Sequence, residues 1–181
     1  MALNLAEVIA GLKARTGKPV MVLTNATMLQ DPQVRRDLLG ADKVFCKLDA
    51  SDDRMLQLID RPVPGITLRG IVDGIKALRA EYPGYLAIQS MFMPQNMKDI
   101  EAYAGLLNEI RPDEVQLNTP LRPVPKGWYI EARGNHDRES APYQAFELKH
   151  LDKDQAVALE ATLRELTGLK IVSVYKTEAE A

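Results

Sequence analysis

Cysteine is almost absent from this chain, with one residue among 181. A single cysteine excludes an intrachain disulfide framework and suits a reducing cytosol. The first residues, Met1 to Asn4, lack the basic segment and the long apolar run of a signal peptide, and no apolar stretch reaches the length of a membrane span. We therefore expect a cytoplasmic protein with no membrane partner.

The chain also lacks an excess of either charge, because 23 Lys and Arg residues face 25 Asp and Glu residues. This near balance excludes nonspecific binding to nucleic acid or to an anionic membrane as a consequence of net charge. No GxxxxGK[ST] or GxSxG motif is present, which excludes a phosphate-binding P-loop and a hydrolase nucleophile elbow. The two histidines, His136 and His150, have no partnering cysteines nearby and do not have the spacing of a zinc site.

What the chain has is a repeating pattern of apolar strand, polar turn and amphipathic helix. Strands are predicted around four apolar segments, at 19–23, 44–48, 85–88 and 114–117, and we expect the first of them to be buried. Such alternation is typical of a parallel α/β sheet, but a closed eight-stranded barrel normally takes about 250 residues. A small flavodoxin-like sheet is a less natural solution, because the order here begins with a helix.

We therefore predict an α/β fold that forms a partial (β/α) barrel. It has about four parallel strands with helices outside, and a short C-terminal αβ extension. Residues 1–125 are expected to form the partial barrel. Residues 126–181 are expected to add a loop, a helix and a strand packed on the same domain.

Helix starts are predicted from capping residues. Asn4 with Glu7, and Asp152 with Gln155, have the spacing of capping boxes, and Asp31 precedes a proline in the first helical position. Asn96 is predicted to cap the helix that follows the third strand.

Polar residues stand at the carboxyl end of each of the four strands, where ligands bind in parallel α/β proteins. The candidates are Thr24, Asn25, Lys47, Asp49, Gln89, Asn118 and Thr119. Each of them can hydrogen-bond to a polar ligand, or can instead cap a helix or satisfy loop backbone. Lys47 and Asp49 are two residues apart on a strand, so both side chains are expected on one face, as a ligand clamp or as a simple ion pair.

Five of these segments, taken in order, resemble the radical S-adenosylmethionine (radical SAM) superfamily. The resemblance covers roughly residues 5 to 125. Within the superfamily, the segments are similar to a subgroup of Fe-S oxidoreductases related to the wyosine-pathway enzymes. The segments are Leu23-Thr24-Asn25-Ala26 (similar to "TNG"), Lys47-Leu48-Asp49-Ala50 (similar to "SLDA"), Arg61-Pro62 (similar to "NRP", with Asp60 in place of Asn), Gln89-Ser90-Met91-Phe92-Met93 followed by Asn96, and Gln116-Leu117-Asn118-Thr119-Pro120-Leu121-Arg122-Pro123.

The resemblance implies an oxidoreductase that binds S-adenosylmethionine and a [4Fe-4S] cluster. It implies that the cofactor-binding residues are Thr24, Asn25, Lys47, Asp49, Gln89, Met91 and Asn118. Candidates on the substrate side are Arg122, Trp128 and His136, in a tail segment rich in proline and glycine. The substrate, a small molecule or an RNA, is not specified by these motifs.

The sequence departs from the family at the cluster loop. The CxxxCxxC motif and the Gly-Gly-Glu segment of the family are both missing, and Cys46 stands alone within a predicted strand, where a buried apolar role is expected. We expect the chain to be the carboxyl-terminal part of a radical SAM protein and to be inactive alone. The cluster would then be held by an N-terminal segment or by a partner, and the isolated chain could also self-associate. The alternatives are a non-catalytic accessory module and an unrelated small α/β enzyme.

Overall fold

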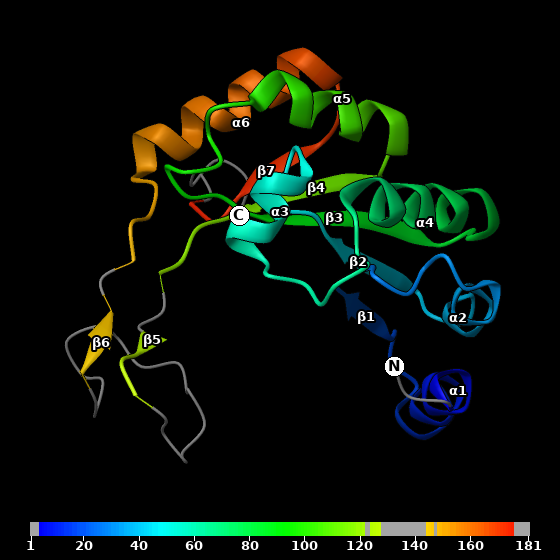
Figure 1. Ribbon diagram of the computed structural model, residues 1–181. Coiled ribbons are helices and arrows are strands. Elements are labelled where there is room, and N and C mark those ends of the chain that lie inside the picture. The colour runs from blue at the N-terminus through cyan, green and yellow to red at the C-terminus, as the bar shows by residue number, and fades with distance from the viewer. Residues whose placement is uncertain (1–3, 122–123, 128–143, 147, 176–181) are drawn as a thin grey trace.

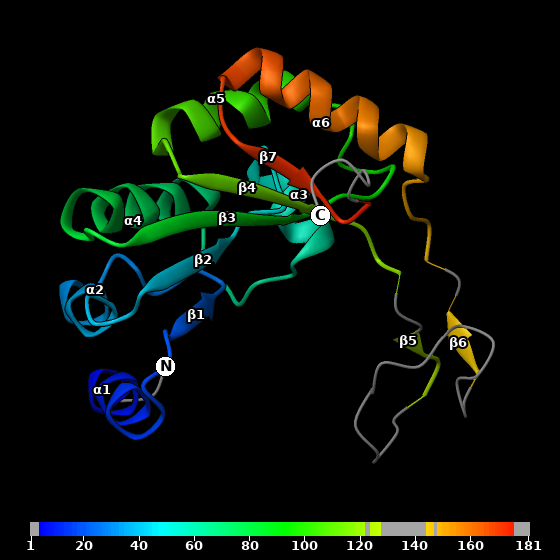
Figure 2. The same cartoon turned by 180° about the vertical axis from the view of Figure 1, so that it is seen from behind.

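The computed structural model of the protein describes residues 4–121, 124–127, 144–146 and 148–175. Its centre is a parallel sheet of five strands in the order β1-β2-β3-β4-β7 (Figures 1 and 2). The strands are β1 (Met21–Thr24), β2 (Lys43–Lys47), β3 (Tyr85–Met91), β4 (Glu114–Asn118) and β7 (Ile171–Ser173). The predicted α/β fold of a partial barrel is confirmed, and the last strand joins the same sheet beside β4 as its fifth member.

Six helices accompany the sheet in the described part of the chain. They are α1 (Leu5–Thr16), α2 (Pro32–Leu38), α3 (Asp53–Ile59), α4 (Leu68–Glu81), α5 (Ile100–Ile110) and α6 (Lys153–Thr167). Figure 1 shows α4, α5 and α6 along one side of the sheet, with α3 beyond the carboxyl ends of the strands. A short antiparallel pair, β5 (Val124–Pro125) and β6 (Ala145–Phe146), lies apart from this sheet. Among the described residues, no helix combines the length and the apolarity that a membrane crossing needs.

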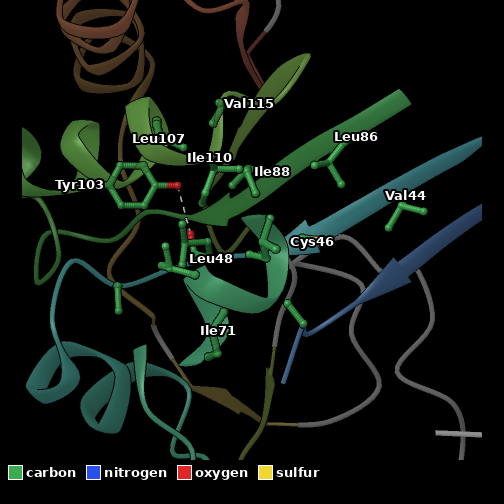
Figure 3. Close-up of a cluster of buried hydrophobic side chains, with 14 of the residues drawn as sticks. Val44, Cys46, Leu48, Ile71, Leu86, Ile88, Tyr103, Leu107, Ile110 and Val115 are labelled. Carbon is green, nitrogen blue, oxygen red and sulfur yellow. Dashed lines mark hydrogen bonds between the residues drawn. The ribbon is translucent and has the colours of Figure 1, made fainter. Parts of the chain in front are cut away.

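The core lies between the sheet and the helices on that side. Every second strand residue faces it, and Val44, Cys46, Leu86, Ile88 and Val115 are fully buried there. Figure 3 shows these side chains meeting residues of α4 and α5, among them Ile71, Leu107 and Ile110. Burial of such apolar surface contributes roughly 25 cal/mol per Å², so this layer is the main source of stability.

The opposite face of the sheet is open at its edge. In the sheet of the described residues β1 is an end strand that pairs only with β2, and Met21 and Leu23 are 53% and 58% exposed. The expectation that the first strand is buried is therefore wrong. A buried strand needs cover on both faces and a neighbour on each side, and β1 has one neighbour.

Two of the four predicted helix caps are formed. Asp31 accepts a hydrogen bond from Gln33 N at α2, and Asp152 and Gln155 form the predicted capping box of α6. At α1 the helix begins after Asn4 as predicted, but the predicted capping box is wrong, because Asn4 makes no side-chain cap hydrogen bond. The apolar face of α1 is only partly covered, since Ile9 is buried while Val8 and Leu12 are 44% and 47% exposed.

Gly74 lets α4 pack closely on the loop between β1 and α2. A Cβ atom at Gly74 would lie 2.9 Å from Leu29 Cβ and 3.0 Å from the Leu29 carbonyl carbon. Both of these atoms belong to a fully buried residue, so neither moves easily. The glycine therefore fixes the position of the loop that carries Asn25.

We expect Gly74→Ala to lower the free energy of unfolding by about 1–3 kcal/mol because the added methyl group overpacks this contact. Gly105→Ala is the matched control: Gly105 also lies inside a helix, and nothing stands within 4 Å of its added Cβ. The control should gain about 0.5–1 kcal/mol from helix propensity. Urea unfolding of both variants measures the difference, and equal effects would contradict the close contact at Leu29.

Candidate functional site

The carboxyl ends of β1 to β4 lie next to each other, as the strand-end prediction requires. In the register of the sheet, Thr24 is opposite Cys46, Lys47 is opposite Gln89, and Met91 is opposite Asn118. Parallel strands bring these ends to one edge, where the segments that follow them form a common mouth.

An ion cluster of Lys47, Asp49 and Asp60 stands at this mouth. The Lys47 Nζ atom donates hydrogen bonds to Asp49 Oδ2 and to Asp60 Oδ1. The predicted pairing of Lys47 with Asp49 is therefore confirmed, whereas Asp60 was not among the predicted site residues. Asp60 follows the last residue of α3, so Lys47 ties the end of that helix to the end of β2.

Burial separates the two partners of the Lys47–Asp49 pair. The Asp49 side chain is 1% exposed, whereas the Lys47 side chain is 43% exposed. Burial raises the pKa of Asp49 to about 6, although Lys47 and the Met91 N–H oppose the shift. For Lys47, burial acts to lower the pKa, but the charges of Asp49 and Asp60 outweigh it and the pKa is raised. The protonation of Asp49 is thus the sensitive part of the cluster.

Asp49 also joins β2 to the end of β3. Its Oδ1 atom accepts a hydrogen bond of 2.9 Å from Met91 N, and its backbone carbonyl accepts one of 2.9 Å from Asn96 Nδ2. Asn96 is 5% exposed, and its remaining side-chain hydrogen bonds go to Met93 N and Met91 O. The prediction that Asn96 caps a helix is wrong, because α5 begins at Ile100 after Asp99.

Tyr103 supports the same segment from α5. Its hydroxyl donates a 3.1 Å hydrogen bond to the Leu48 carbonyl and also hydrogen-bonds with the Ser90 hydroxyl. The dashed line in Figure 3 joins Tyr103 to Leu48. The ring meets Phe92 edge to face with centroids 5.3 Å apart. Burial raises the pKa of Tyr103, so this hydroxyl stays protonated and works as a fixed donor.

Thr24 and Asn25 serve the loop backbone. The Thr24 hydroxyl accepts a hydrogen bond from Ala26 N, and Asn25 Oδ1 accepts from Thr27 N and from the Thr27 hydroxyl. Ala26, which lies between Asn25 and Thr27, adopts a left-handed backbone with φ of 63°. This conformation costs a residue with a Cβ atom about 1–2 kcal/mol, which explains why the similar "TNG" segments have glycine there.

A row of hydrogen-bonded polar side chains joins β3 to β4. Gln89 Nε2 donates to Gln116 Oε1 at 3.3 Å, and Gln116 Nε2 donates to Glu114 Oε1 at 2.9 Å. Asn118 and Met91 are half-buried at the strand ends, as the site prediction placed them. The backbone carbonyl of Asn118 accepts a 2.7 Å hydrogen bond from Phe92 N, which holds the ends of β3 and β4 together.

Three cavities border the ion cluster, and each of them is lined in part by Lys47. A sheet-side cavity of about 470 Å³ is lined by Met91, Met93 and Pro120 together with the cluster. A smaller one of about 200 Å³ beside it reaches Thr24, Asn25 and Gln89. The other large cavity, of about 570 Å³, lies between the β1–α2 loop, α3 and the start of α4. Volumes of roughly 300–1,000 Å³ are typical of small-molecule sites.

The substrate-side candidates Arg122, Trp128 and His136 lie outside the described residues. Thr119 serves the fold, because its hydroxyl accepts a hydrogen bond from Leu151 N.

A [4Fe-4S] cluster does not fit the residues present. Cys46 is the single cysteine of the chain; it is fully buried in β2, and burial raises its pKa to about 12. Cluster irons are held by several thiolates. Within the ranges that the structure describes, no group of three histidine, cysteine or acidic residues is placed to hold a metal ion.

The chain resembles solved structures of one enzyme superfamily. It aligns with archaeal TYW1 at a TM-score of 0.63 and 14% identity, over 93% of this chain and 46% of that one. It aligns with a domain of pyruvate-formate lyase-activating enzyme from Bacteroides vulgatus at a TM-score of 0.62 and 15% identity, over 94% and 91%. The fold is that of radical SAM enzymes.

Streptococcus suis SuiB bound to S-adenosylmethionine matches this radical SAM fold equally well. Its TM-score is 0.62 at 14% identity, over 94% of this chain and 36% of that one. Identities this low relate the folds alone, so the residues of the mouth must be argued from their own geometry.

Curated relatives are similar in sequence over most of the chain. UPF0026 protein slr1464 of Synechocystis is 46% identical over 137 residues, which is 75% of this chain and 52% of that protein. UPF0026 protein MJ1312 of Methanocaldococcus jannaschii is 33% identical over 116 residues, 62% of this chain and 36% of that protein. The chain thus spans about half or less of these relatives. No family model matches it.

The raised pKa of Asp49 predicts a pH-dependent stability. The folded state keeps the Asp49 proton up to about pH 6, whereas the unfolded chain releases it near pH 3.8. Between these values the folded state binds more protons, so stability contributed by the protonated carboxyl is lost as pH rises through about 6. Asp49→Asn cannot titrate, and its free energy of unfolding relative to wild type should rise by about 2 kcal/mol from about pH 4 to about pH 7.

Chemical denaturation across this pH range measures that difference, because titrations elsewhere in the chain cancel between the two proteins. Asp73→Asn removes a carboxylate that pairs with Arg69 on the surface of α4, and it controls for the loss of one acidic side chain. A slope for Asp49→Asn no steeper than that of this control would contradict the raised pKa of Asp49.

Proposed function

We propose that this chain is part of a radical SAM oxidoreductase and binds the nucleoside side of S-adenosylmethionine at the carboxyl ends of its strands. The observation that carries the proposal is the Lys47, Asp49 and Asp60 cluster at the mouth of the sheet-side cavity. The fold adds support, since a protein with the same fold, SuiB, has been solved bound to S-adenosylmethionine.

The residues of the sheet-side cavity suit a nucleoside. The Asp60 carboxylate accepts hydrogen bonds from vicinal ribose hydroxyls, and Gln89, which lines the smaller cavity beside it, offers an amide donor and acceptor to a base edge. Met91 and Met93 supply a polarizable apolar wall, which makes favourable contacts with an aromatic base. Lys47 orients both carboxylates, so its part is to position the acceptors.

The cluster ligands must come from outside this chain. One buried cysteine cannot supply the three thiolates of a CxxxCxxC loop. We propose that the chain is the carboxyl-terminal portion of a barrel whose cluster-bearing part is a further segment or a partner. The second candidate is a non-catalytic accessory module that keeps the nucleoside-binding rim. A single cysteine is as consistent with such a module as with a fragment of an enzyme. Arg122, Trp128 and His136 stay proposed contacts for a small-molecule or RNA substrate.

Binding of S-adenosylmethionine to the chain tests the proposal. Isothermal titration calorimetry should detect binding to wild type, and Asp60→Asn and Gln89→Ala should each weaken it at least about tenfold, the loss of one good hydrogen bond to a charged or buried group. Asp60 is chosen because its side chain is 21% exposed and its loss leaves the Asp49 pair intact. Asp73→Asn is the matched control and should bind as wild type does. Absence of binding to a folded wild type would overturn the proposal.

The open edge of β1 is the surface on which the proposed partner segment would add. Among the residues that the structure describes, no strand pairs with the outer side of β1, and Met21 and Leu23 expose apolar side chains beside it. Exposed apolar edge strands pair with other strands unless they are protected. An unrelated, self-sufficient α/β enzyme would be expected to cover such an edge.

We therefore expect the isolated chain to self-associate, and Leu23→Lys to raise the dissociation constant at least about tenfold, because a lysine protects an edge strand. Val157→Lys is the control, since Val157 is 40% exposed on α6, away from this edge. Sedimentation velocity over a range of concentrations measures both variants. A wild-type chain that stays monomeric at high concentration would argue against an edge that needs a partner.

A further inference from the structure

The 570 Å³ cavity between the β1–α2 loop, α3 and the start of α4 is separate from the proposed nucleoside site. Its walls include Met28, Leu56, Ile66 and Ile71, none of which borders the sheet-side cavity. The two cavities share one boundary, formed by Lys47, Asp49, Ile59, Asp60 and Arg61. A ligand in either cavity would therefore contact the same ion cluster.

The floor and walls of this cavity are mainly apolar. Leu48, Leu56 and Ile71 are buried members of the core, and Met28 and Ile66 extend the same surface toward solvent. Apolar walls of this extent bind a branched or aromatic side chain rather than a sugar, because a sugar would leave hydroxyl groups without partners.

The rim of the cavity offers opposite charges next to each other. Asp60 Oδ1 accepts from Lys47, and in the described part of the chain its Oδ2 atom accepts no hydrogen bond. The neighbouring Arg61 guanidinium makes no ion pair with any residue that the structure describes. Asn25 uses its Oδ1 atom for Thr27, which leaves the Nδ2 amino group as a donor at the same rim.

The backbone around this rim is also unusual. Within the described ranges, three residues other than glycine have a left-handed backbone, and two of them lie at this cavity. Arg61, with φ of 47°, lines it, and Ala26, with φ of 63°, lies between the lining residues Asn25 and Thr27. Such conformations are retained where the surrounding structure enforces them, often beside ligands.

We infer that this cavity is a second ligand site and that it binds a free L-amino acid with a large apolar side chain. The side chain packs against the apolar wall of the cavity, the α-ammonium pairs with Asp60, and the α-carboxylate pairs with Arg61 and with the Asn25 amide. An unpaired guanidinium is suited to a carboxylate because it donates hydrogen bonds in a planar fork. The site does not depend on S-adenosylmethionine binding, but the shared boundary places the two ligands side by side.

The test is calorimetric titration of the chain with L-leucine, isocaproate and isoamylamine. The two analogues keep the branched side chain but lack the ammonium and the carboxylate, respectively. L-Leucine should bind, and each analogue should bind at least about tenfold more weakly, because a charged partner is left unpaired. Binding of isocaproate as strong as that of L-leucine would overturn the assignment of Asp60 and would leave a simple apolar-acid site.

Variants separate the rim from the fold. Arg61→Gln should weaken L-leucine at least about tenfold, whereas Arg54→Gln, an equal change of charge on α3 outside the cavity lining, should leave it unchanged. Ile66→Phe should narrow the cavity at its apolar wall and reduce binding while leaving thermal unfolding close to that of wild type. Equal binding by all three variants and wild type would overturn the site.

Competition distinguishes this inference from the proposed function. Asp60 borders both cavities, so saturating S-adenosylmethionine is expected to lower the affinity for L-leucine but to leave its stoichiometry unchanged, since the ligands occupy different cavities. Displacement of L-leucine by S-adenosylmethionine would reduce the two sites to one and overturn the inference alone. A chain that binds L-leucine but not S-adenosylmethionine would sustain the second site and overturn the proposed function.

Discussion

The Lys47 ammonium group, held between two carboxylates, is the contact on which the mouth of the sheet depends. It joins β2 to the end of α3 through Asp60, and Asp49 continues the connection to β3 through the Met91 N–H. Removing the lysine would leave a carboxylate that is 1% exposed without its counter-ion, a loss far greater than that of a surface pair. The same contact forms part of the boundary between the two large cavities, so it helps to shape both sites.

The sequence predicted those parts of the site that follow from the two-residue periodicity of strands. The Lys47 and Asp49 pair was predictable because residues two apart on a strand share a face, and the strand ends converge in any parallel sheet. Asp60 and Asn96 were beyond that reasoning, since their roles depend on where α3 and the loop after β3 fold back. Asn96 has the residue type of a helix cap, but the hydrogen bonds that make asparagine a good cap also let it tie two strand ends together.

The fold was predictable to a similar depth. Alternation of strands and helices established a parallel sheet with helices outside, but the strand β7 could have continued the sheet or packed elsewhere, and local pattern does not decide pairing over more than fifty residues. The exposure of Leu23 was missed for a related reason. An apolar strand is assigned to the interior by composition, whereas its exposure is determined by whether a neighbouring strand exists.

The burial of Cys46 has a practical consequence. Its thiol, with a pKa of about 12 and no solvent exposure, is almost never a thiolate at neutral pH, and the thiolate is the reactive form. A cysteine introduced on the surface would thus be labelled alone, with the native cysteine left in place. Val63, 71% exposed at the rim of the 570 Å³ cavity, is a position where a fluorophore attached in this way would report directly on what enters it.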